Sequence, residues 1–381
     1  MSCLSWCGPQ CEEYSPRGGS GGRSPYPGGG IMPRISAEEL RTLGRRIFEA
    51  LNVPHDEATW VAELLVRANL VGHDSHGVIR IPQYAQAIKS AHVQPGAAFE
   101  IVQESPATAL VNGNWGLGQV VARRAMELAI RKAKAMKISS VGVHNVYHVG
   151  RLADYTRMAA EQDLVGIMMV NGGGASPIVA PFGGAAGRLA TNPISIAFPT
   201  GGPIPFLLDM ATSIVAEGKV RVKRNRGEKT PEGWLLDNQG QPTTDPNAFY
   251  REPRGAILPL GGSAGHKGYG LAMVVEIMSG ILARAGYARP GATRFSNGTF
   301  IIVIDISAFV YPQEFRTEID DLLQYLKSAP KAPGVEAILY PGEPEFLAHQ
   351  QRERDGIPLE EETWQQILGL AHELGIAVAA R

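Results

Sequence analysis

Apolar residues begin to recur at helical spacing at residue 36. Ser36 and Glu39 form a capping box, in which each side chain can satisfy a free backbone N–H group of the other residue. The apolar positions that follow recur every three or four residues: Leu40, Leu43, Ile47 and Leu51. A second stretch of this kind runs from about 55 to 71. The pattern therefore predicts two amphipathic helices before residue 72.

Short apolar runs alternate with helical patterns between residues 106 and 210. The runs expected to be buried strands cover residues 109–111, 139–143, 164–170, 194–198 and 206–210. A helix rich in small apolar residues is expected at 119–136, and the glycine-rich segment 112–118 is expected to be a turn. This alternation predicts an α/β sheet domain of roughly 170 to 190 residues.

The last third of the chain predicts one more apolar strand and three helices. The strand covers residues 299–306, and helical patterns cover 314–326 and 361–374. The third helix, at 267–285, is expected to bury one apolar side: Leu271, Val274, Val275, Met278, Ile281 and Leu282. The polar segments 220–241 and 245–254 are expected to be surface loops.

These elements divide the chain into segments. Residues 34–105 are expected to begin a helical domain, 106–290 to form the α/β domain, and 291–381 to complete the helical domain. The expected fold class is α/β (α+β), with a large mixed sheet domain and a helical domain built from both chain ends. Residues 1–33 are rich in Gly, Pro, Ser and Arg and are expected to be a disordered extension, with Met32 as an alternative start.

Charge and cysteine content narrow the classes of function. The net charge of -1 provides no basic field for nucleic acid or an anionic membrane, so a small neutral or anionic ligand is favoured. Cys3, Cys7 and Cys11 are the three cysteines, so disulfides cannot hold the fold together, which suits a cytoplasmic protein. Their spacing lacks a fourth ligand for a metal. The sequence contains no run of about eighteen apolar residues that would predict a membrane span.

The stretch VGHDSHGVIRIPQY, residues 71–84, concentrates polar chemistry at the end of the second predicted helix. On a helical turn His73, His76 and Arg80 would share one face. A proton donor would then lie beside a guanidinium that fits a carboxylate, as a 2-hydroxy or 2-oxo acid requires. The alternative is a polar helix end with a hydrogen-bonded histidine.

Phosphate-binding signatures of the common kinds are missing. Residues 113–118 have the wrong order for GxGxxG, and 261–268 lack the Gly-Lys-Ser/Thr run of a P-loop. Three glycine-rich turns nevertheless lead into predicted helices, at Gly150, Gly172 and Gly265, and each could hold a pyrophosphate or be an ordinary turn.

Other polar residues leave two alternatives open. His144 and His148, with His73 and His76, could form a metal site, although no carboxylate or thiolate spacing completes a ligand set. Asp209 ends an apolar strand, and as a partner of His76 it would favour the imidazolium form. The basic run from 221 to 229 could be a solvated loop or could meet the 2′-phosphate of NADP.

Five segments in order resemble the type 2 malate and L-lactate dehydrogenase family: HDSHGVIRIPQY, HNVYHVGRL, APFGG with TNPISIAFP, LLDMATS with EGKVRV, and HKGYGLAMVVEIMSG. The similarity covers about residues 34–381. LYPGEPE, IPLEEETW and HNVYHVGR are most similar to the branch called hydroxycarboxylate dehydrogenase B. The resemblance implies a non-Rossmann NAD(P)-binding fold, NAD or NADP as cofactor, a small 2-oxo or 2-hydroxy acid as substrate, and a homodimer.

The resemblance also implies roles for individual residues. His76 would be the proton donor, with Ser75 and Asp209 as relay or orienting partners and His148 in the pocket. Arg80 would hold the substrate carboxylate, and Thr191 and Asn192 would contact the substrate. Residues 106–290 would then bind both cofactor and substrate. The positions matching cofactor contacts are His76, Gly150, Arg151, Leu152, Leu207, Leu208, Asp209, Met210, Ala211, His266, Lys267, Asn297, Gly342, Glu343, Pro344 and Glu345.

Two departures from the family pattern affect the transfer. Ala190 stands where the family commonly has glycine, and its Cβ could crowd the approach of a cofactor. Arg80 is typical of the wider family, whereas the hydroxycarboxylate branch can carry an apolar residue there. Three hypotheses follow: a 2-oxo acid reductase, a metal-dependent enzyme using the four histidines, and a binding protein that has lost turnover. The sequence does not select the 2-oxo acid or the choice between NADH and NADPH.

Overall fold

The computed structural model describes residues 33–174, 177–289 and 294–378. The expected extension at 1–33 therefore lies outside the described residues except for Pro33, as do all three cysteines. Within the described ranges, no helix is both long and apolar enough to cross a membrane.

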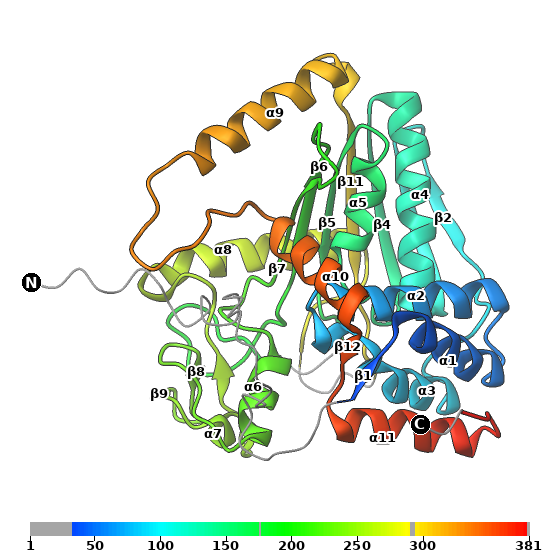
Figure 1. The fold of residues 1–381 in the computed structure, drawn as a ribbon, viewed down its shortest axis with the longest axis vertical. Coiled ribbons are helices and arrows are strands. Elements are labelled where there is room, and N and C mark those ends of the chain that lie inside the picture. The colour runs from blue at the N-terminus through cyan, green and yellow to red at the C-terminus, as the bar shows by residue number, and fades with distance from the viewer. Residues whose placement is uncertain (1–32, 175–176, 290–293, 379–381) are drawn as a thin grey trace, which may run out of the picture.

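A seven-stranded mixed sheet forms the centre of the molecule (Figure 1). Only β3 and β4 pair in parallel; the other neighbours are antiparallel. This order differs from a doubly wound nucleotide-binding sheet, in which the strands are mostly parallel. The strands, in spatial order, are β2 (Glu100–Glu104), β3 (Thr108–Gly116), β4 (Ile138–Val146), β11 (Thr299–Asp305), β5 (Leu164–Val170), β6 (Ile194–Phe198) and β7 (Phe206–Met210).

The predicted strands are confirmed, with two differences. The glycine-rich segment expected as a turn at 112–118 largely belongs to β3, which runs on to Gly116 and pairs there with Val146. Strand β2, which was not predicted, and β11 belong to this same sheet, although their residues were assigned by sequence to the first and last segments of the chain. Strand β11 lies at its middle, between β4 and β5.

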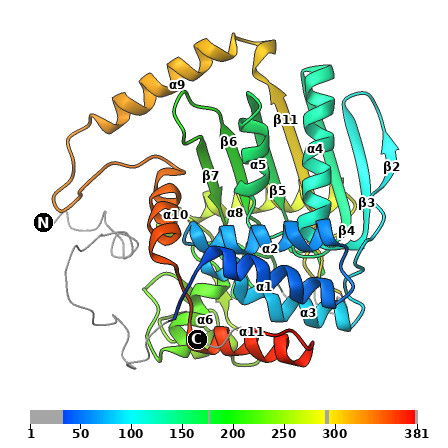
Figure 2. The same ribbon diagram turned by 45° about the vertical axis from the view of Figure 1, so that its right-hand side comes forward.

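Helices cover both faces of the sheet (Figures 1 and 2). On one face lie α4 (Gly118–Met136) and α5 (Ala153–Ala160), whose apolar residues pack on those of β4, β5 and β11. On the other face lie α8 (Gly265–Val275) and the π-helix η5 that continues it, Glu276–Leu282. The helix α9 (Pro312–Lys327), which follows η6 (Ile306–Ala308), projects beyond the sheet.

The helix predicted at 267–285 is correct in place, and its expected buried side is correct only in part, since Val275 is buried and Met278 packs against the same core. The sheet is covered by small or short residues that recur at helical spacing: Ala272, Val275, Ser279, Gly280 and Ala283. Val274, Ile281 and Leu282, which were expected to be buried, are exposed instead. Space is limiting at Gly280, because a Cβ there would lie 2.5 Å from the carbonyl oxygen of Gly286. The larger aliphatic residues form the outer face.

A helical part is built from both ends of the chain, as expected. One apolar core joins residues of the first three helices to Ile357, Trp364 and Ile367. A short two-stranded sheet pairs Ile35 with Ile357. The elements are β1 (Arg34–Ile35), α1 (Ala37–Ala50), α2 (His55–Leu70), α3 (Ile81–Lys89), α10 (Glu343–Asp355), β12 (Ile357–Pro358) and α11 (Glu361–Glu373).

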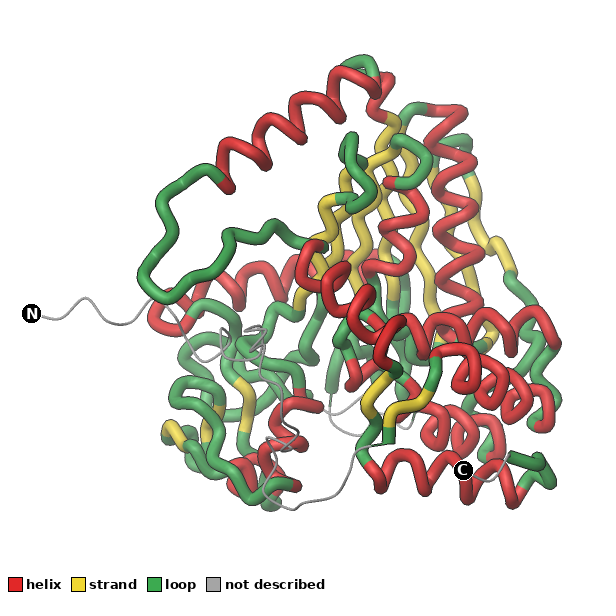
Figure 3. Tube along the Cα trace, in the orientation of Figure 1, coloured by secondary structure: helices red, strands yellow, loops and turns green. Residues whose placement is uncertain are grey.

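Residues 213–260 form a small lobe rather than the surface loops expected there. Val220, Leu235, Phe249 and Ile257 make an apolar core of their own, so the polar composition concealed a folded unit. Figure 3 shows its short strands and helices among long loops. Its elements are α6 (Glu217–Asn225), β8 (Leu235–Leu236), β9 (Pro242–Thr243), α7 (Pro246–Tyr250) and β10 (Ala256–Ile257), and η4 (Gly262–Ala264) follows it.

Candidate active site

The stretch 73–80, called the catalytic loop below, follows the C-terminal end of α2. It contains two short 3-10 turns, η2 (Asp74–His76) and η3 (Val78–Arg80), separated by Gly77 in an extended conformation. The expectation that three side chains share one face of a continuous helical turn is therefore wrong. The two turns nevertheless place His76 and Arg80 close enough for the charge of Arg80 to affect the pKa of His76.

Asn69 fixes the shape of this loop. Its Oδ1 accepts a hydrogen bond from the backbone N–H of Val78 at 2.8 Å, and its Nδ2 donates to Asp74 Oδ1 at 2.6 Å. Asn69 is buried and out of reach of water, so these two bonds satisfy an amide that would otherwise have no hydrogen-bond partner. A Cβ on Gly77 would lie 2.1 Å from Asn69 Oδ1, which explains the glycine at that position.

The C-terminal end of the chain also supports the loop. Arg352 of α10 binds Asp74 with two nitrogens, at 2.6 Å and 3.1 Å. Two such parallel bonds fix orientation as well as distance. His73 lies 3.4 Å from Glu345 of the same helix. The catalytic loop is thus held between a helix from the start of the chain and one from its end.

His76 lies against a second histidine inside the site. Its Nδ1 lies 3.0 Å from Ser75 Oγ, and its ring stacks on that of His148 with centroids 5.7 Å apart. Burial, followed by the positive charge of Arg80, lowers the pKa of His76 to about 3. His76 is therefore a neutral imidazole at neutral pH. The expectation that it is held as imidazolium is wrong for this structure.

His148 is held by a buried chain of polar groups that the sequence did not reveal. The hydroxyl of Tyr84 lies 2.6 Å from His148 Nδ1, and Gln119 Nε2 donates to that hydroxyl at 2.8 Å. Burial lowers the pKa of His148 well below its usual value and raises the pKa of Tyr84. All three groups are therefore neutral, and His148 is positioned to present the rest of its ring to the site.

Two of the three guanidinium nitrogens of Arg80 donate hydrogen bonds within the protein. Its Nε donates to the backbone oxygen of Ser75 at 2.7 Å, and Nη1 donates to Gln83 Oε1 at 2.6 Å. Burial lowers the pKa of Arg80, and a nearby positive charge, that of Arg221, lowers it further. A half-buried guanidinium beside a neutral imidazole favours a bound carboxylate, which can accept two charge-assisted hydrogen bonds from it.

Asp209 lies on β7, the edge strand of the sheet, and is half-buried. Its Oδ2 accepts from the backbone N–H of Ala153 at 2.8 Å. Burial raises its pKa, and the charge of Arg151 opposes that rise. Among the described residues we find no hydrogen bond between Asp209 and His76, so the expected direct partnership is not made here. The carboxyl instead ties β7 to the start of α5.

Most of the segments expected to contact a cofactor converge around Asp209. The Ala153 bond brings 207–211 next to 150–152, and Leu207 N donates to Pro341 O at 2.9 Å, which brings 342–345 alongside. Asn297 Oδ1 accepts from Val149 N at 3.1 Å, which places Asn297 next to the segment 150–152. Arg151 is buried and binds Asp154, so a ligand would meet mainly its backbone.

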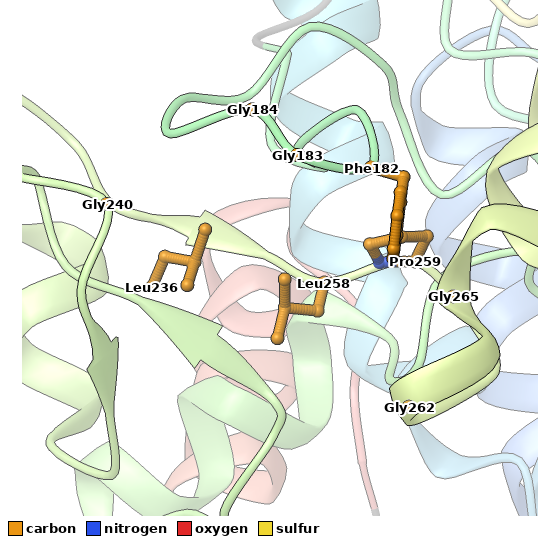
Figure 4. Close-up of a pocket in the computed structure, with 9 residues that line it drawn as sticks. All are labelled: Phe182, Gly183, Gly184, Leu236, Gly240, Leu258, Pro259, Gly262 and Gly265. Carbon is orange, nitrogen blue, oxygen red and sulfur yellow. The ribbon is translucent and has the colours of Figure 1, made fainter.

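His266 and Lys267 lie at the N-terminal end of α8, beside a shallow pocket of about 260 Å³ (Figure 4). The ring of Phe182 meets His266 edge-on, with centroids 5.6 Å apart. Leu236, Leu258 and Pro259 supply the apolar wall, and glycines from three loops supply the rest. The pocket has room for a flat ring but offers few polar side chains.

Asn192, expected to contact the substrate, uses its amide nitrogen within the protein. It is fully buried, and its Nδ2 donates to Glu276 Oε2 at 2.6 Å and to Ala272 O at 3.1 Å. Thr191 is half-buried, and its backbone oxygen accepts from Thr212. The methyl group of Ala190 points at Gly172, where a Cβ would lie 2.5 Å from it. The departure from the family's glycine at 190 is thus accommodated by the glycine at 172.

Glu276 is the centre of a buried network that sequence patterns missed. Its Oε1 accepts from Asn171 Nδ2 at 2.9 Å and from the backbone N–H of Ala288 at 3.0 Å, and its Oε2 accepts from Asn192. The carboxylate therefore joins the ends of β5 and β6 to the helix behind the sheet. A glutamate in an apolar helix, four residues after Ala272, was the available signal.

The four-histidine hypothesis is not supported by the geometry. His76 and His148 stack, whereas His73 pairs with Glu345 and His144 lies near Arg284 and Glu100. In the described part of the chain, no group of three or more His, Cys, Asp or Glu side chains is placed to hold a metal ion.

Comparison with known proteins gives one consistent result. The family described as malate/L-lactate dehydrogenase matches residues 35–368. Malate dehydrogenase of Pyrococcus horikoshii is 39% identical over 90% of this chain and 96% of its own. A solved structure of that enzyme has a TM-score of 0.82, with 36% identity over 91% of this chain and 98% of its own.

Two further relatives carry other substrate names. L-Sulfolactate dehydrogenase of Methanocaldococcus jannaschii is 39% identical over 90% of this chain and 98% of its own. Hydroxycarboxylate dehydrogenase B of Escherichia coli is 35% identical over 90% of this chain and 95% of its own. Similarity therefore extends over about nine-tenths of this chain in each case.

Proposed function

The chain belongs to the malate/L-lactate dehydrogenase family, and from this membership we infer that it is a dehydrogenase that interconverts 2-hydroxy acids and 2-oxo acids. Relatives named for malate, sulfolactate and hydroxycarboxylates act on acids of this kind. The observation that carries the assignment of the site is the neutral, half-buried His76, which lies between Ser75 and His148 and next to Arg80.

We propose that His76 exchanges a proton with the C2 oxygen while Arg80 binds the carboxylate. In the tautomer whose Nδ1–H donates to Ser75 Oγ, the Nε2 lone pair is available to take the hydroxyl proton of a 2-hydroxy acid. In the reverse direction His76 must first be protonated. A substrate carboxylate at Arg80 would offset the charge that lowers the pKa of His76 and so favour that state.

We propose NAD or NADP as the cofactor, which would accept or supply the hydride. Two glycines support the fit, because Gly150 and Gly342 have φ of 80° and 108° and expose backbone where a side chain would be strained. A Cβ on Gly342 would lie 2.8 Å from the carbonyl oxygen of Pro205. Arg151 Nε is buried without a hydrogen bond among the described residues. Glu343 and Glu345 follow, and they already bind Lys327 and His73, so a ribose hydroxyl would have to share these carboxylates.

The test of this function is a panel of 2-oxo acids assayed with both NADH and NADPH. Pyruvate, oxaloacetate, an aryl-pyruvate and a cyclic imino acid would cover the substrate classes. We expect oxidation of the reduced cofactor with at least one of them. Absence of turnover with every pair, from protein whose circular dichroism shows it to be folded, would contradict the proposal.

The charge of Arg80 leads to a prediction for His76. Replacement Arg80→Gln removes a positive charge that disfavours imidazolium, so the pKa of His76 should rise above about 3 and stay below 6.5, because burial remains. NMR titration of the imidazole would measure this. Arg46→Gln, which changes a surface arginine bonded to Ala377 O, is the matched control. An unchanged or lower pKa in Arg80→Gln would show that this charge is not felt at His76.

We also propose a homodimer in the cytoplasm. The outer face of α8 and η5 exposes aliphatic residues over three turns, with Ile277 at 52%, Ile281 at 60% and Leu282 at 56% exposure. An apolar face of this size on a helix is typical of an interface. Analytical ultracentrifugation should give about twice the chain mass of 40.8 kDa.

The absence of cysteine after Cys11 suits a reducing compartment such as the cytoplasm.

A further inference from the structure

The first turn of α6, in the small lobe, faces the catalytic loop. An ideal Cβ on Gly218 would lie 3.1 Å from Ser75 Cβ, so the helix and the loop approach each other as closely as a glycine allows. Ser75 carries the backbone oxygen that holds Arg80 Nε. The side chains of this helix turn are therefore neighbours of the residues assigned to substrate binding.

Arg221 projects from the next turn of α6 and is held in place by Glu217. Its Nη2 donates to Glu217 Oε2 at 2.6 Å, and its Nε lies 3.4 Å from Oε1. Tyr250 OH donates to Glu217 Oε1 at 2.6 Å and fixes the carboxylate from the other side. Tyr250 also hydrogen-bonds to the guanidinium. The side chain of Arg221 is nevertheless 51% exposed, so part of the guanidinium is accessible to a ligand.

The charge of Arg221 is felt at the catalytic loop. After burial, Arg221 is the largest positive influence that lowers the pKa of Arg80. Glu217 is affected in turn: burial raises its pKa, but the bonds from Arg221 and Tyr250 and the charge of Arg80 lower it overall. Two guanidinium groups therefore flank the site, one in the catalytic loop and one on the small lobe, with Glu217 ionised beside the second.

We propose that Arg221 is a specificity-determining residue that binds a second acidic group of the substrate. The inference rests on the function proposed above, in which Arg80 holds the C1 carboxylate. A 2-oxo acid with a carboxylate or a sulfonate at the far end of its carbon chain would then be bound at both ends, and a charge-assisted hydrogen bond to Arg221 would favour it over an uncharged analogue. A carboxylate offers two oxygen acceptors to a guanidinium and a sulfonate offers three, so either group can form two hydrogen bonds with it.

The test compares the variant Arg221→Ala with the unmodified enzyme on three substrates: pyruvate, oxaloacetate and sulfopyruvate. We expect kcat/KM for the two dianionic substrates to fall about 10- to 100-fold, and that for pyruvate to change by less than about threefold. A fall for only one dianion would identify which acidic group is recognised. Activity with pyruvate also shows that the variant is folded.

Lys223→Ala is the matched control, because it removes one charge from the same helix where the side chain pairs with Glu228. Its ratio of kcat/KM between dianionic substrates and pyruvate should equal that of the unmodified enzyme. Equal losses on all three substrates in Arg221→Ala, or a change confined to the preference for NADPH over NADH, would overturn the proposal. If the unmodified enzyme reduced no 2-oxo acid, the proposed function itself would fail, which is a distinguishable result.

Discussion

Replacement of His76 by alanine is expected to lower kcat for 2-oxo acid reduction by about 10²- to 10⁴-fold. The variant loses the imidazole that is proposed to exchange a proton with the C2 oxygen and that stacks on His148. Arg80 keeps its bonds to Ser75 O and Gln83, so KM for the substrate should change much less than kcat. Steady-state kinetics at saturating cofactor would separate the two effects.

The control for His76→Ala is His92→Ala, which removes an exposed imidazole bonded to Ser90 Oγ. Its kcat should be unchanged. Thermal melting of both variants distinguishes lost chemistry from lost structure, because His76 makes one side-chain hydrogen bond in this structure, to Ser75. A His76→Ala protein that reduces 2-oxo acids at the unmodified rate would remove the proposed mechanism.

Replacement of Glu276 by alanine is expected to destabilise the protein by about 2–5 kcal/mol. The carboxylate accepts from two asparagine amides and one backbone N–H in a buried site, and the variant leaves all three donors without that acceptor. A small cavity adds to the loss. Denaturant unfolding would measure the change, provided that the transition is two-state.

The matched control is Glu318→Ala, which removes an exposed carboxylate from α9 and should stay within about 0.5 kcal/mol of the unmodified protein. Glu276→Gln is a stricter test, since it keeps the shape but turns one acceptor oxygen into a donor that faces Asn171 or Asn192. It should also destabilise the protein. If Glu276→Ala unfolded at the same denaturant concentration as Glu318→Ala, the hydrogen bonds of Glu276 would not contribute to the free energy of unfolding.

Periodicity predicted those elements whose burial follows a simple pattern. Strands β5, β6 and β7 were expected at the residues where they occur, because continuous apolar runs bounded by turn residues have few other uses. The capping box at Ser36 is confirmed by the bond from Glu39 N to Ser36 Oγ. Local signals of this kind depend only on neighbouring residues.

Features that depend on distant residues could not be read in the same way. The buried side of α8 and η5 was predicted only in part, because an apolar helix leaves open which side meets the sheet residues Met169 and Phe300. Tyr84 and Gln119 looked like ordinary helix residues, and their roles appear only when α3 and α4 meet at His148. The small lobe was missed because its core consists of a few apolar residues scattered through polar sequence.

The candidate site was predicted in outline from one dense stretch, and its details depended on contacts across the fold. His76, Ser75 and Arg80 lie together as expected. Asp209 was expected beside His76 because a charge in an apolar strand needs a partner, but a backbone N–H already serves that need. Asn192 was placed with the substrate by its position in a motif, whereas its amide is used to hold Glu276.

The position of β11 has a consequence for how the chain folds during synthesis. Strand β11 separates β4 from β5 in the sheet, yet it follows β7 in the sequence. Until Thr299 to Asp305 leaves the ribosome, β4 and β5 each present an unpaired apolar edge. At about 5–20 residues per second, that interval lasts on the order of 10 s. We therefore expect nascent chains to carry two unpaired strand edges, and their association with chaperones to fall once Thr299 to Asp305 has emerged.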